Sequence, residues 1–239
     1  PPNEKRIFVI GSSITLGWGV PADGVFTAIV ESRLNRERDG ETIFALINAG
    51  VANYNTFHEV ELFKNQMAQI QPDMAVLNYF IRDVEEIPLT KNSPILKHSL
   101  FLAFLVQKGQ GLVGRLKGES MADYVQMYVD GQPGWERSKR SVLELKAICE
   151  ENKIPLVIML TPSPHNISKR GPFPGIYDKI VSTFREMGIA VLNNYPAFYE
   201  KYGQHPDRLW VSRDDPHPNF RGHQIMADEL YQYLVSHPI

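Results

Sequence analysis

Five short apolar runs, separated by segments of helical periodicity, constrain the fold of this chain more than any other feature. The first run is continuously apolar, as expected for a strand in a sheet that is covered on both faces. Helical segments are expected at 56–70, 136–151 and 175–187, where each returns the chain so that the next strand lies parallel, and a closing helix is expected at 219–235. The pattern predicts an α/β fold, a three-layer α/β/α sandwich around a five-stranded parallel sheet. The runs are RIFVI at 6–10, TIFALINAG at 42–50, DMAVLNYFI at 73–81, IPLVIMLTP at 154–162 and GIAVLNN at 188–194.

The length of 239 residues fits a single domain that spans residues 1–239. Residues 84–135 interrupt the alternation of strands and helices, and they include the most apolar stretch, SLFLAFLV at 99–106. That stretch is too short to span a bilayer, which takes about 20 residues. Two interpretations of the segment remain open: an insertion that covers the active site, or a peripheral helical excursion.

Composition excludes several classes of function. The net charge of −2 and the lack of a basic block give no support for nucleic-acid binding. The single cysteine, Cys149, rules out a disulfide framework and a cysteine-rich metal site. No phosphate-binding loop or dinucleotide fingerprint is present, so no cofactor is expected. Asp214, Asp215 and His217 can ligate an ion, but two carboxylates and one imidazole without a further cluster are weak support, so no metal is expected. The chain begins at Pro1-Pro2, which we interpret as a trimmed start of a soluble protein, and a secreted or periplasmic location stays open.

The turn after the first run, GSSITLGWGV at 11–20, places two serines where an α/β sheet binds its ligands, beyond the carboxyl end of a strand. If the following residues begin a helix, its free N–H groups favour a developing negative charge. The glycines of the segment allow a tight turn. A serine nevertheless needs a base to take its proton.

A candidate base lies near the C-terminus, in the segment DDPHPNFRGH at 214–223. His217 is flanked by two prolines, which keep it out of a regular helix, and Asp214 stands three positions before it. In a tight turn this spacing can bring the carboxylate onto one imidazole nitrogen and leave the other free to face a serine. His165 and His223 are alternative candidates, as substrate contacts.

Taken together, these segments resemble the SGNH/GDSL hydrolases over nearly the whole chain. GSSITLGWGV resembles the family's Gly-Asp-Ser block and NAGVANYNT its second block, while DDPHPNFRGH resembles its final Asp-x-x-His block. The resemblance implies the flavodoxin-like SGNH fold and a catalytic triad of Ser13, His217 and Asp214. It also implies an oxyanion hole to which the backbone amides of Ser13 and Gly50 contribute.

Two positions depart from the family pattern. Ser12 replaces the aspartate of the first block, which in the family supports the turn. Arg82, in NYFIRDVEE, aligns with the asparagine that supplies the third oxyanion donor. Arg82 can donate to an oxyanion, or it can pair with Asp83, Glu85 or Glu86 and leave the hole incomplete. Asn53 and Asn78 are polar neighbours that can substitute in part.

Three functions are compatible with these observations. The first is hydrolysis of a carboxylic ester through an acyl-enzyme, either as a lipase-like esterase or as a carbohydrate deacetylase. The substrate is then a small-molecule, lipid-like or acylated carbohydrate ester, and the apolar residues at 95–105 favour the lipid-like class. The second is acyl transfer to an alcohol by the same triad. The third is a non-catalytic binding protein with this fold, as suggested by Arg82.

Overall fold

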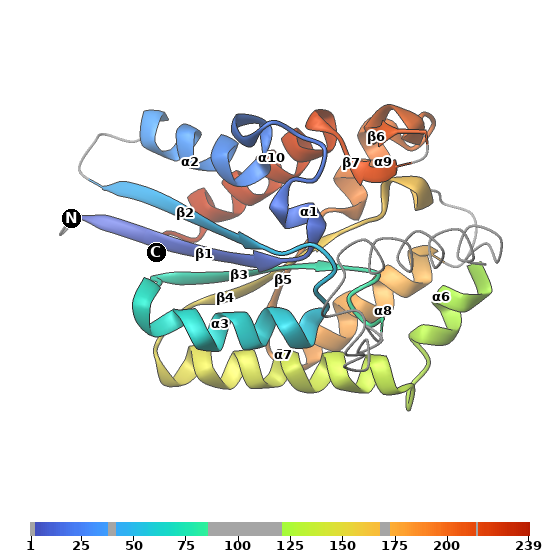
Figure 1. Ribbon diagram of the computed structural model, residues 1–239, viewed down its shortest axis with the longest axis horizontal. Helices are drawn as coiled ribbons and strands as arrows, with labels where there is room; N and C mark the ends of the chain where they lie inside the picture. The colour runs from blue at the N-terminus through green and yellow to red at the C-terminus, as the bar shows by residue number, and fades with distance from the viewer. Residues whose placement is uncertain (1–2, 38–41, 86–120, 168–172, 214) are drawn as a thin grey trace, which may run out of the picture.

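The computed structural model describes residues 3–37, 42–85, 121–167, 173–213 and 215–239. Five parallel strands form the main sheet, in the order β2-β1-β3-β4-β5, and they coincide with the five apolar runs (Figure 1). The predicted parallel sheet is therefore confirmed. The strands are β1 (Glu4–Gly11), β2 (Ile43–Gly50), β3 (Met74–Phe80), β4 (Leu156–Thr161) and β5 (Ala190–Asn193).

Helices cover both faces of the sheet, as the sequence predicts (Figure 1). One face carries α2 (Phe26–Glu37) and α10 (Phe220–Ser236), and the other carries α3 (Thr56–Ile70), α7 (Pro133–Glu151) and α8 (Phe173–Glu186). Strand β1 shows why: Phe8 and Ile10 are fully buried in one core cluster, and Ile7 and Val9 are fully buried in the other. A strand that is apolar on both faces requires a helical layer on each side.

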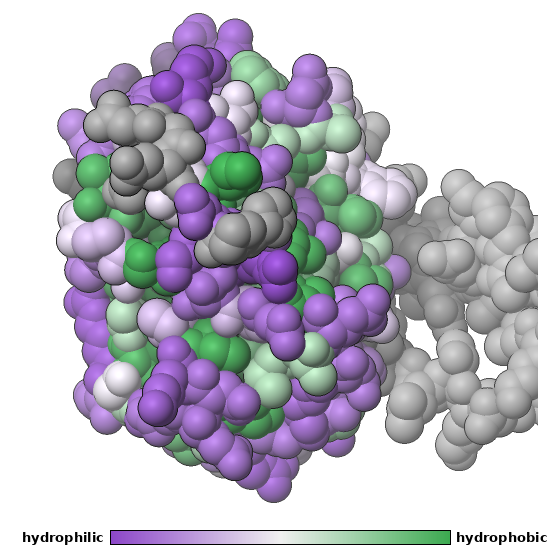
Figure 2. Space-filling model, turned by 90° about the vertical axis from the view of Figure 1, so that its left-hand side faces the viewer, coloured by the Kyte–Doolittle hydropathy of each residue, from purple (hydrophilic) through white to green (hydrophobic). Residues whose placement is uncertain are grey.

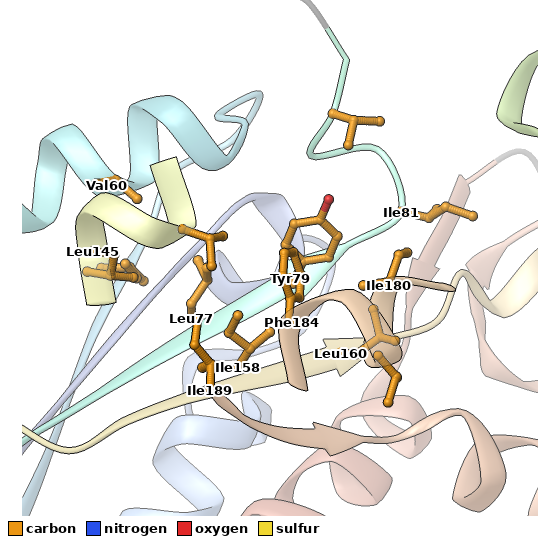
Figure 3. Close-up of a cluster of buried hydrophobic side chains, with 14 of the residues drawn as sticks. Val60, Leu77, Tyr79, Ile81, Leu145, Ile158, Leu160, Ile180, Phe184 and Ile189 are labelled. Atoms are coloured by element: carbon orange, nitrogen blue, oxygen red, sulfur yellow. The ribbon is translucent and has the colours of Figure 1, made fainter. Parts of the chain in front are cut away.

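The cluster on the α3, α7 and α8 side is the larger of the two cores (Figure 3). Leu77 and Tyr79 extend from β3 into it, and Tyr79 meets Phe184 of α8 edge to face, with ring centroids 5.0 Å apart. The hydroxyl group of Tyr79 lies 3.1 Å from that of Ser138 on α7. The sheet is thus fixed against α7 and α8 by apolar packing and by buried hydrogen bonds.

The 12-residue helix α2 was not predicted from the sequence, and neither were several short elements. They are α1 (Ser13–Leu16), η1 (Ala22–Gly24), α6 (Met121–Met127), η2 (Pro164–Asn166), α9 (Tyr195–Tyr202), η3 (Pro206–Leu209), β6 (Trp210–Ser212) and β7 (Asp215–Pro218). Strands β6 and β7 pair antiparallel in a small second sheet. The first and last of these elements, α1 and β7, carry the candidate site.

The structure describes the interruption at 84–135 only in part. Residues 86–120, which include the apolar run 99–106, lie outside the described residues. Tyr124, Tyr128 and Trp135, near its end, are buried in the same core as α7 and α8. The hydroxyl group of Tyr128 donates to the carbonyl of Ile81, 2.9 Å away. This part of the segment is therefore built into the domain, while the covering of the active site stays a prediction.

The start of α3 differs from the expected capping box. The helix begins at Thr56, as predicted, but its N-cap is Asn55, whose side-chain oxygen accepts from the N–H of His58 at 3.3 Å. Glu59 does not reach back to the cap: its side chain is fully buried, and neither carboxyl oxygen has a hydrogen-bond partner among the described residues. The short amide of Asn55 caps this helix more directly than a glutamate three residues later.

Figure 2 shows the end of the molecule at which the strands begin. Hydrophilic side chains predominate there, and apolar ones are scattered among them. The serine turn lies at the opposite end, where the strands finish (Figure 1). Of the helices described, none is long and apolar enough to cross a membrane.

Candidate active site

Ser13 is the first residue of α1, a single helical turn that follows β1 directly. Ser12 precedes it in an extended conformation, and Gly17 ends the turn in the left-handed region, at φ 84°. A Cβ at Gly17 would also overlap the side chain of Val25. The turn therefore depends on glycine at its end, because other residues rarely adopt this conformation and none has room for its side chain.

Thr15, in the middle of α1, is held from neighbouring strands. Asn48 of β2 donates to its carbonyl at 2.6 Å, and Asn78 of β3 donates to its hydroxyl group at 2.9 Å. Thr161 of β4 in turn donates to the side-chain oxygen of Asn78 at 2.6 Å. The serine turn is thus hydrogen-bonded to β2 and β3, and β4 in turn holds the side chain of Asn78. Asn78 serves as an anchor in this network, instead of the oxyanion donor that the sequence suggested.

His217 reaches Ser13 from the other end of the chain. The hydroxyl oxygen of Ser13 lies 2.8 Å from Nε2 of His217, and Nδ1 of His217 lies 2.5 Å from Oδ1 of Asp215. A carboxylate can only accept, so Nδ1 carries the proton and Nε2 is left to accept from the serine. Serine, imidazole and carboxylate therefore form a continuous chain in which the serine can lose its proton as it attacks an electrophile.

Among the described residues, the carboxylate in this chain is that of Asp215, whereas the sequence analysis assigned the contact to Asp214. Asp214 lies outside the described residues. The local conformation explains the contact of Asp215, because residues two apart in an extended strand point to the same face. The same carboxylate oxygen also accepts from the backbone N–H of His217, at 3.1 Å. The expected spacing of three assumed a tight turn where the chain forms β7.

Trp18 completes the surroundings of Asp215. Its indole Nε1–H donates to Oδ2 of Asp215 at 3.1 Å. Burial acts to raise the pKa of Asp215, but hydrogen bonds from the side chain and backbone of His217, together with that of Trp18, hold the pKa below its ordinary value. Asp215 therefore stays ionised beside the imidazole.

Two predicted oxyanion donors are engaged elsewhere. The backbone N–H of Gly50 donates to the side-chain oxygen of Asn48 at 2.9 Å. Arg82 makes a two-pronged contact with Glu85, with Nε and Nη2 at 2.6 and 3.0 Å from the two carboxylate oxygens. The pairing of Arg82 with Glu85 is one of the alternatives that the sequence left open. The N–H of Ser13 lies in the first turn of α1, where helical amides have no acceptor within the helix.

Gly50 contributes to the site by its lack of a side chain. It ends β2 in register with Gly11, which ends β1. A Cβ at Gly50 would overlap the backbone of Thr15 and Leu16. Close packing of α1 against the end of β2 therefore requires glycine at this position.

Two further polar residues were singled out from the sequence: Ser12, which directly precedes Ser13, and Asn53, which follows the end of β2. The hydroxyl group of Ser12 is buried and has no hydrogen-bond partner among the described residues, and its side chain does not cap α1. Asn53 is exposed and adopts a left-handed conformation, at φ 63°. Asparagine tolerates that region better than most residues do.

The two alternative histidines differ in their surroundings. His223 is fully buried, accepts from the N–H of Phe26 at 3.3 Å, and has its pKa lowered to about 4 by burial and by the charge of His217. It is therefore a neutral core residue. His165 is exposed and packs edge-on against Trp210, with ring centroids 3.9 Å apart. Burial lowers its pKa, and the charge of Asp215 opposes this effect.

Sequence reasoning missed Asp215 as the histidine's partner, and it missed Trp18. The indole and the carboxylate are 197 positions apart, so no local pattern connects them. The available signal was the position of Trp18 between two glycines directly after the serine turn. Within the described ranges, no cluster of three or more His, Cys, Asp or Glu side chains is placed to hold a metal ion.

The fold is similar to those of several solved esterases. A two-domain esterase active on acetylated mannans superimposes with a TM-score of 0.60 at 13% identity, over 98% of this chain and 49% of the esterase. The acetyl xylan esterase AlAXEase gives 0.61 at 14%, over 96% and 99% of the two chains. A protein of the G-D-S-L family from Desulfitobacterium hafniense DCB-2 gives 0.57 at 12%, over 95% and 98%.

This chain therefore spans about half the length of the two-domain esterase. No family model matches the sequence, and no curated protein sequence matches it. The observed architecture is the SGNH-hydrolase α/β fold that the sequence resemblance implied.

Proposed function

We propose that this protein is an SGNH-type serine hydrolase that cleaves a carboxylic ester. One observation carries the proposal: Ser13 Oγ lies 2.8 Å from Nε2 of His217, whose Nδ1 contacts the carboxylate of Asp215. Three residues from the two ends of the chain thus meet in the order that nucleophilic catalysis by serine requires. The likeness in fold to esterases supports the same reaction class.

The reaction follows from the roles of these groups. Ser13 attacks the ester carbonyl while His217 takes its proton at Nε2, and Asp215 stabilises the imidazolium that forms. The negative charge of the tetrahedral intermediate develops beside the start of α1, where the N–H of Ser13 is the donor that we assign to it. His217 then gives its proton to the departing alkoxide. Water, activated in turn by His217, hydrolyses the acyl-enzyme and restores Ser13.

We propose an acetylated carbohydrate as the substrate. Of two proteins with the same fold, one is described as active on acetylated mannans and the other as an acetyl xylan esterase. Both descriptions refer to acetyl esters of carbohydrates. The lipid-like alternative depended on the apolar residues at 95–105, which lie outside the described residues. The preference for a small acyl group therefore rests on the likeness in fold to these two esterases.

A second candidate is a non-catalytic protein with the same fold. The N–H of Gly50 is bound to Asn48, and Arg82 is bound to Glu85, so both donors would need new partners to reach an oxyanion. Loss of one oxyanion donor lowers turnover by about 100- to 1,000-fold. On this view the triad geometry persists without supporting measurable turnover.

Release of acetate from acetylated xylo- and manno-oligosaccharides, together with hydrolysis of p-nitrophenyl acetate, tests the proposal. We expect turnover by the wild-type protein and none above background by Ser13→Ala. Ser12→Ala is the matched control, because its hydroxyl group has no partner among the described residues and its loss should leave turnover intact. Absence of turnover on every acetyl ester, by folded protein, would favour the non-catalytic candidate.

A further inference from the structure

We infer that Trp18 is a positioning residue of the active site, which holds the carboxylate of Asp215 so that His217 faces Ser13. The inference rests on the proposed function. It goes beyond that proposal because it assigns a fourth residue to the chain of groups that activates the serine.

The first support is the way in which the carboxylate is held. Oδ1 of Asp215 accepts hydrogen bonds from Nδ1 and from the backbone N–H of His217, at 2.5 and 3.1 Å. Oδ2 accepts a hydrogen bond from the indole Nε1–H of Trp18 at 3.1 Å. An indole can only donate, so this contact is directional. With both oxygens held, rotation of the carboxylate would break at least one hydrogen bond. The imidazole is consequently kept in one orientation.

The second support is a backbone link between Trp18 and the nucleophile. The N–H of Trp18 donates to the carbonyl of Ser13 at 3.1 Å. One residue therefore binds the serine through its main chain and the acid through its side chain. The two halves of the triad, which come from opposite ends of the sequence, are connected through Trp18 as well as through the Ser13–His217 contact.

The loop around Trp18 has a tightly specified path. Gly17 and Gly19 both adopt left-handed conformations, at φ 84° and 78°. A Cβ at either glycine would overlap a valine, Val25 in the first case and Val211 in the second. A loop with this little freedom presents the indole in a fixed position.

Core packing does not explain the presence of a tryptophan here. The side chain of Trp18 is 51% exposed, whereas Trp135 is fully buried. Its ring lies beside that of His217, with centroids 6.1 Å apart and planes tilted by 40°. The hydrogen bond of Trp18 is also among the contacts that lower the pKa of Asp215 against the effect of burial.

The test compares Trp18→Phe, which removes the N–H and keeps a ring, with Trp18→Ala, which removes both. The first readout is the rate at which a small alkyl fluorophosphonate inactivates each protein, measured across pH. The second is the strongly deshielded proton NMR signal of the hydrogen bond between His217 and Asp215. Circular dichroism checks that each variant is folded.

We expect both variants to react about ten-fold more slowly than wild type, the size of effect typical for loss of a hydrogen bond to a charged group. The midpoint on the acid side of the pH–rate profile should shift, and the NMR signal should weaken or shift in Trp18→Phe. Unchanged rate, profile and signal in Trp18→Phe would overturn the role of the indole N–H. A slow Trp18→Ala beside a normal Trp18→Phe would do the same and assign the effect to the ring.

The outcome for wild-type protein separates this inference from the proposed function. If wild type does not react at Ser13, the proposed function fails. The NMR signal then still reports on the inference, which is overturned if the signal is the same in wild type and Trp18→Phe.

Discussion

Asp215 and His217 lie two positions apart in an extended strand, and this spacing decides which carboxylate reaches the imidazole. Their side chains share a face of β7, and the backbone N–H of His217 closes a second contact to the same oxygen. Asp214, at a spacing of three, matches the family motif in sequence. A local conformation that was not predicted thus leads us to propose Asp215 as the residue that orients His217.

Substitution of the two aspartates tests this assignment. In Asp215→Asn the amide NH₂ faces Nδ1 and favours the wrong tautomer of His217, so we expect kcat to fall by about 1,000- to 10,000-fold. Asp214→Asn should stay within a few-fold of wild type. Ester turnover, or the rate of fluorophosphonate labelling, measures both. A large loss of turnover in Asp214→Asn, with little loss in Asp215→Asn, would show that Asp214 is the residue that orients His217.

Among the elements, α1 shows how a four-residue helix can be held firmly. Isolated helices of this length are unstable, so its conformation depends on tertiary contacts. Asn48, Asn78 and Gly50 supply them from two neighbouring strands, by hydrogen bonds to Thr15 and by close backbone packing. The position of Ser13 follows from these contacts.

Gly50→Ala should therefore disturb the site through packing. The added Cβ would overlap the backbone of Thr15 and Leu16, and we expect a loss of stability of about 1–3 kcal/mol together with a loss of activity. Gly175→Ala in α8 is the matched control. A Cβ there meets nothing within 4 Å, and alanine in a helix should stabilise the protein by about 0.5–1 kcal/mol. Chemical denaturation measures both, and equal effects would contradict the account.

The strands and four of the long helices (α3, α7, α8 and α10) could be predicted because hydrophobic periodicity records which face is buried, whereas α2 was missed. The helices at 56–70 and 219–235 begin and end within a residue or so of the predicted bounds. Short elements such as α1 and β7 carry no periodicity, so they were missed. The contact between Ser13 and His217 was predicted through the resemblance. Trp18 and the pairing of Gly50 with Asn48 depend on side-chain geometry that a pattern does not contain.

At the scale of the whole molecule, a buried carboxyl group in α3 lowers the stability of the fold. Glu59 is fully buried in α3, and neither of its carboxyl oxygens has a hydrogen-bond partner among the described residues. Burial, followed by the nearby charge of Asp83, raises its pKa well above 4.5. Burial likewise raises the pKa of Asp83, with Glu85 adding to the effect and the N–H of Phe80 opposing it.

A raised folded pKa of Glu59 implies that stability declines as pH rises. Above pH 4.5 the unfolded chain loses its proton while the folded protein retains it, so the free energy of unfolding falls until the folded pKa is passed. Glu59→Gln should raise this free energy by about 1–3 kcal/mol at neutral pH and flatten its pH dependence, with little effect near pH 4.

Thermal unfolding at a series of pH values measures the effect of Glu59→Gln. Glu61→Gln is the control on the same helix, since it removes only the exposed ion pair with Lys64, which is worth less than about 1 kcal/mol. A Glu59→Gln protein that is less stable than wild type at neutral pH would show that the carboxylate is ionised and paired in the fold.

The central claim is that the fold joins the two ends of the chain into an activated serine at Ser13. Reaction with a fluorophosphonate, followed by location of the adduct by mass spectrometry, tests it most directly, because no substrate needs to be known. We predict an adduct on Ser13 in wild type and in Ser12→Ala, and none in Ser13→Ala. Folded wild-type protein without an adduct on Ser13 would contradict the claim.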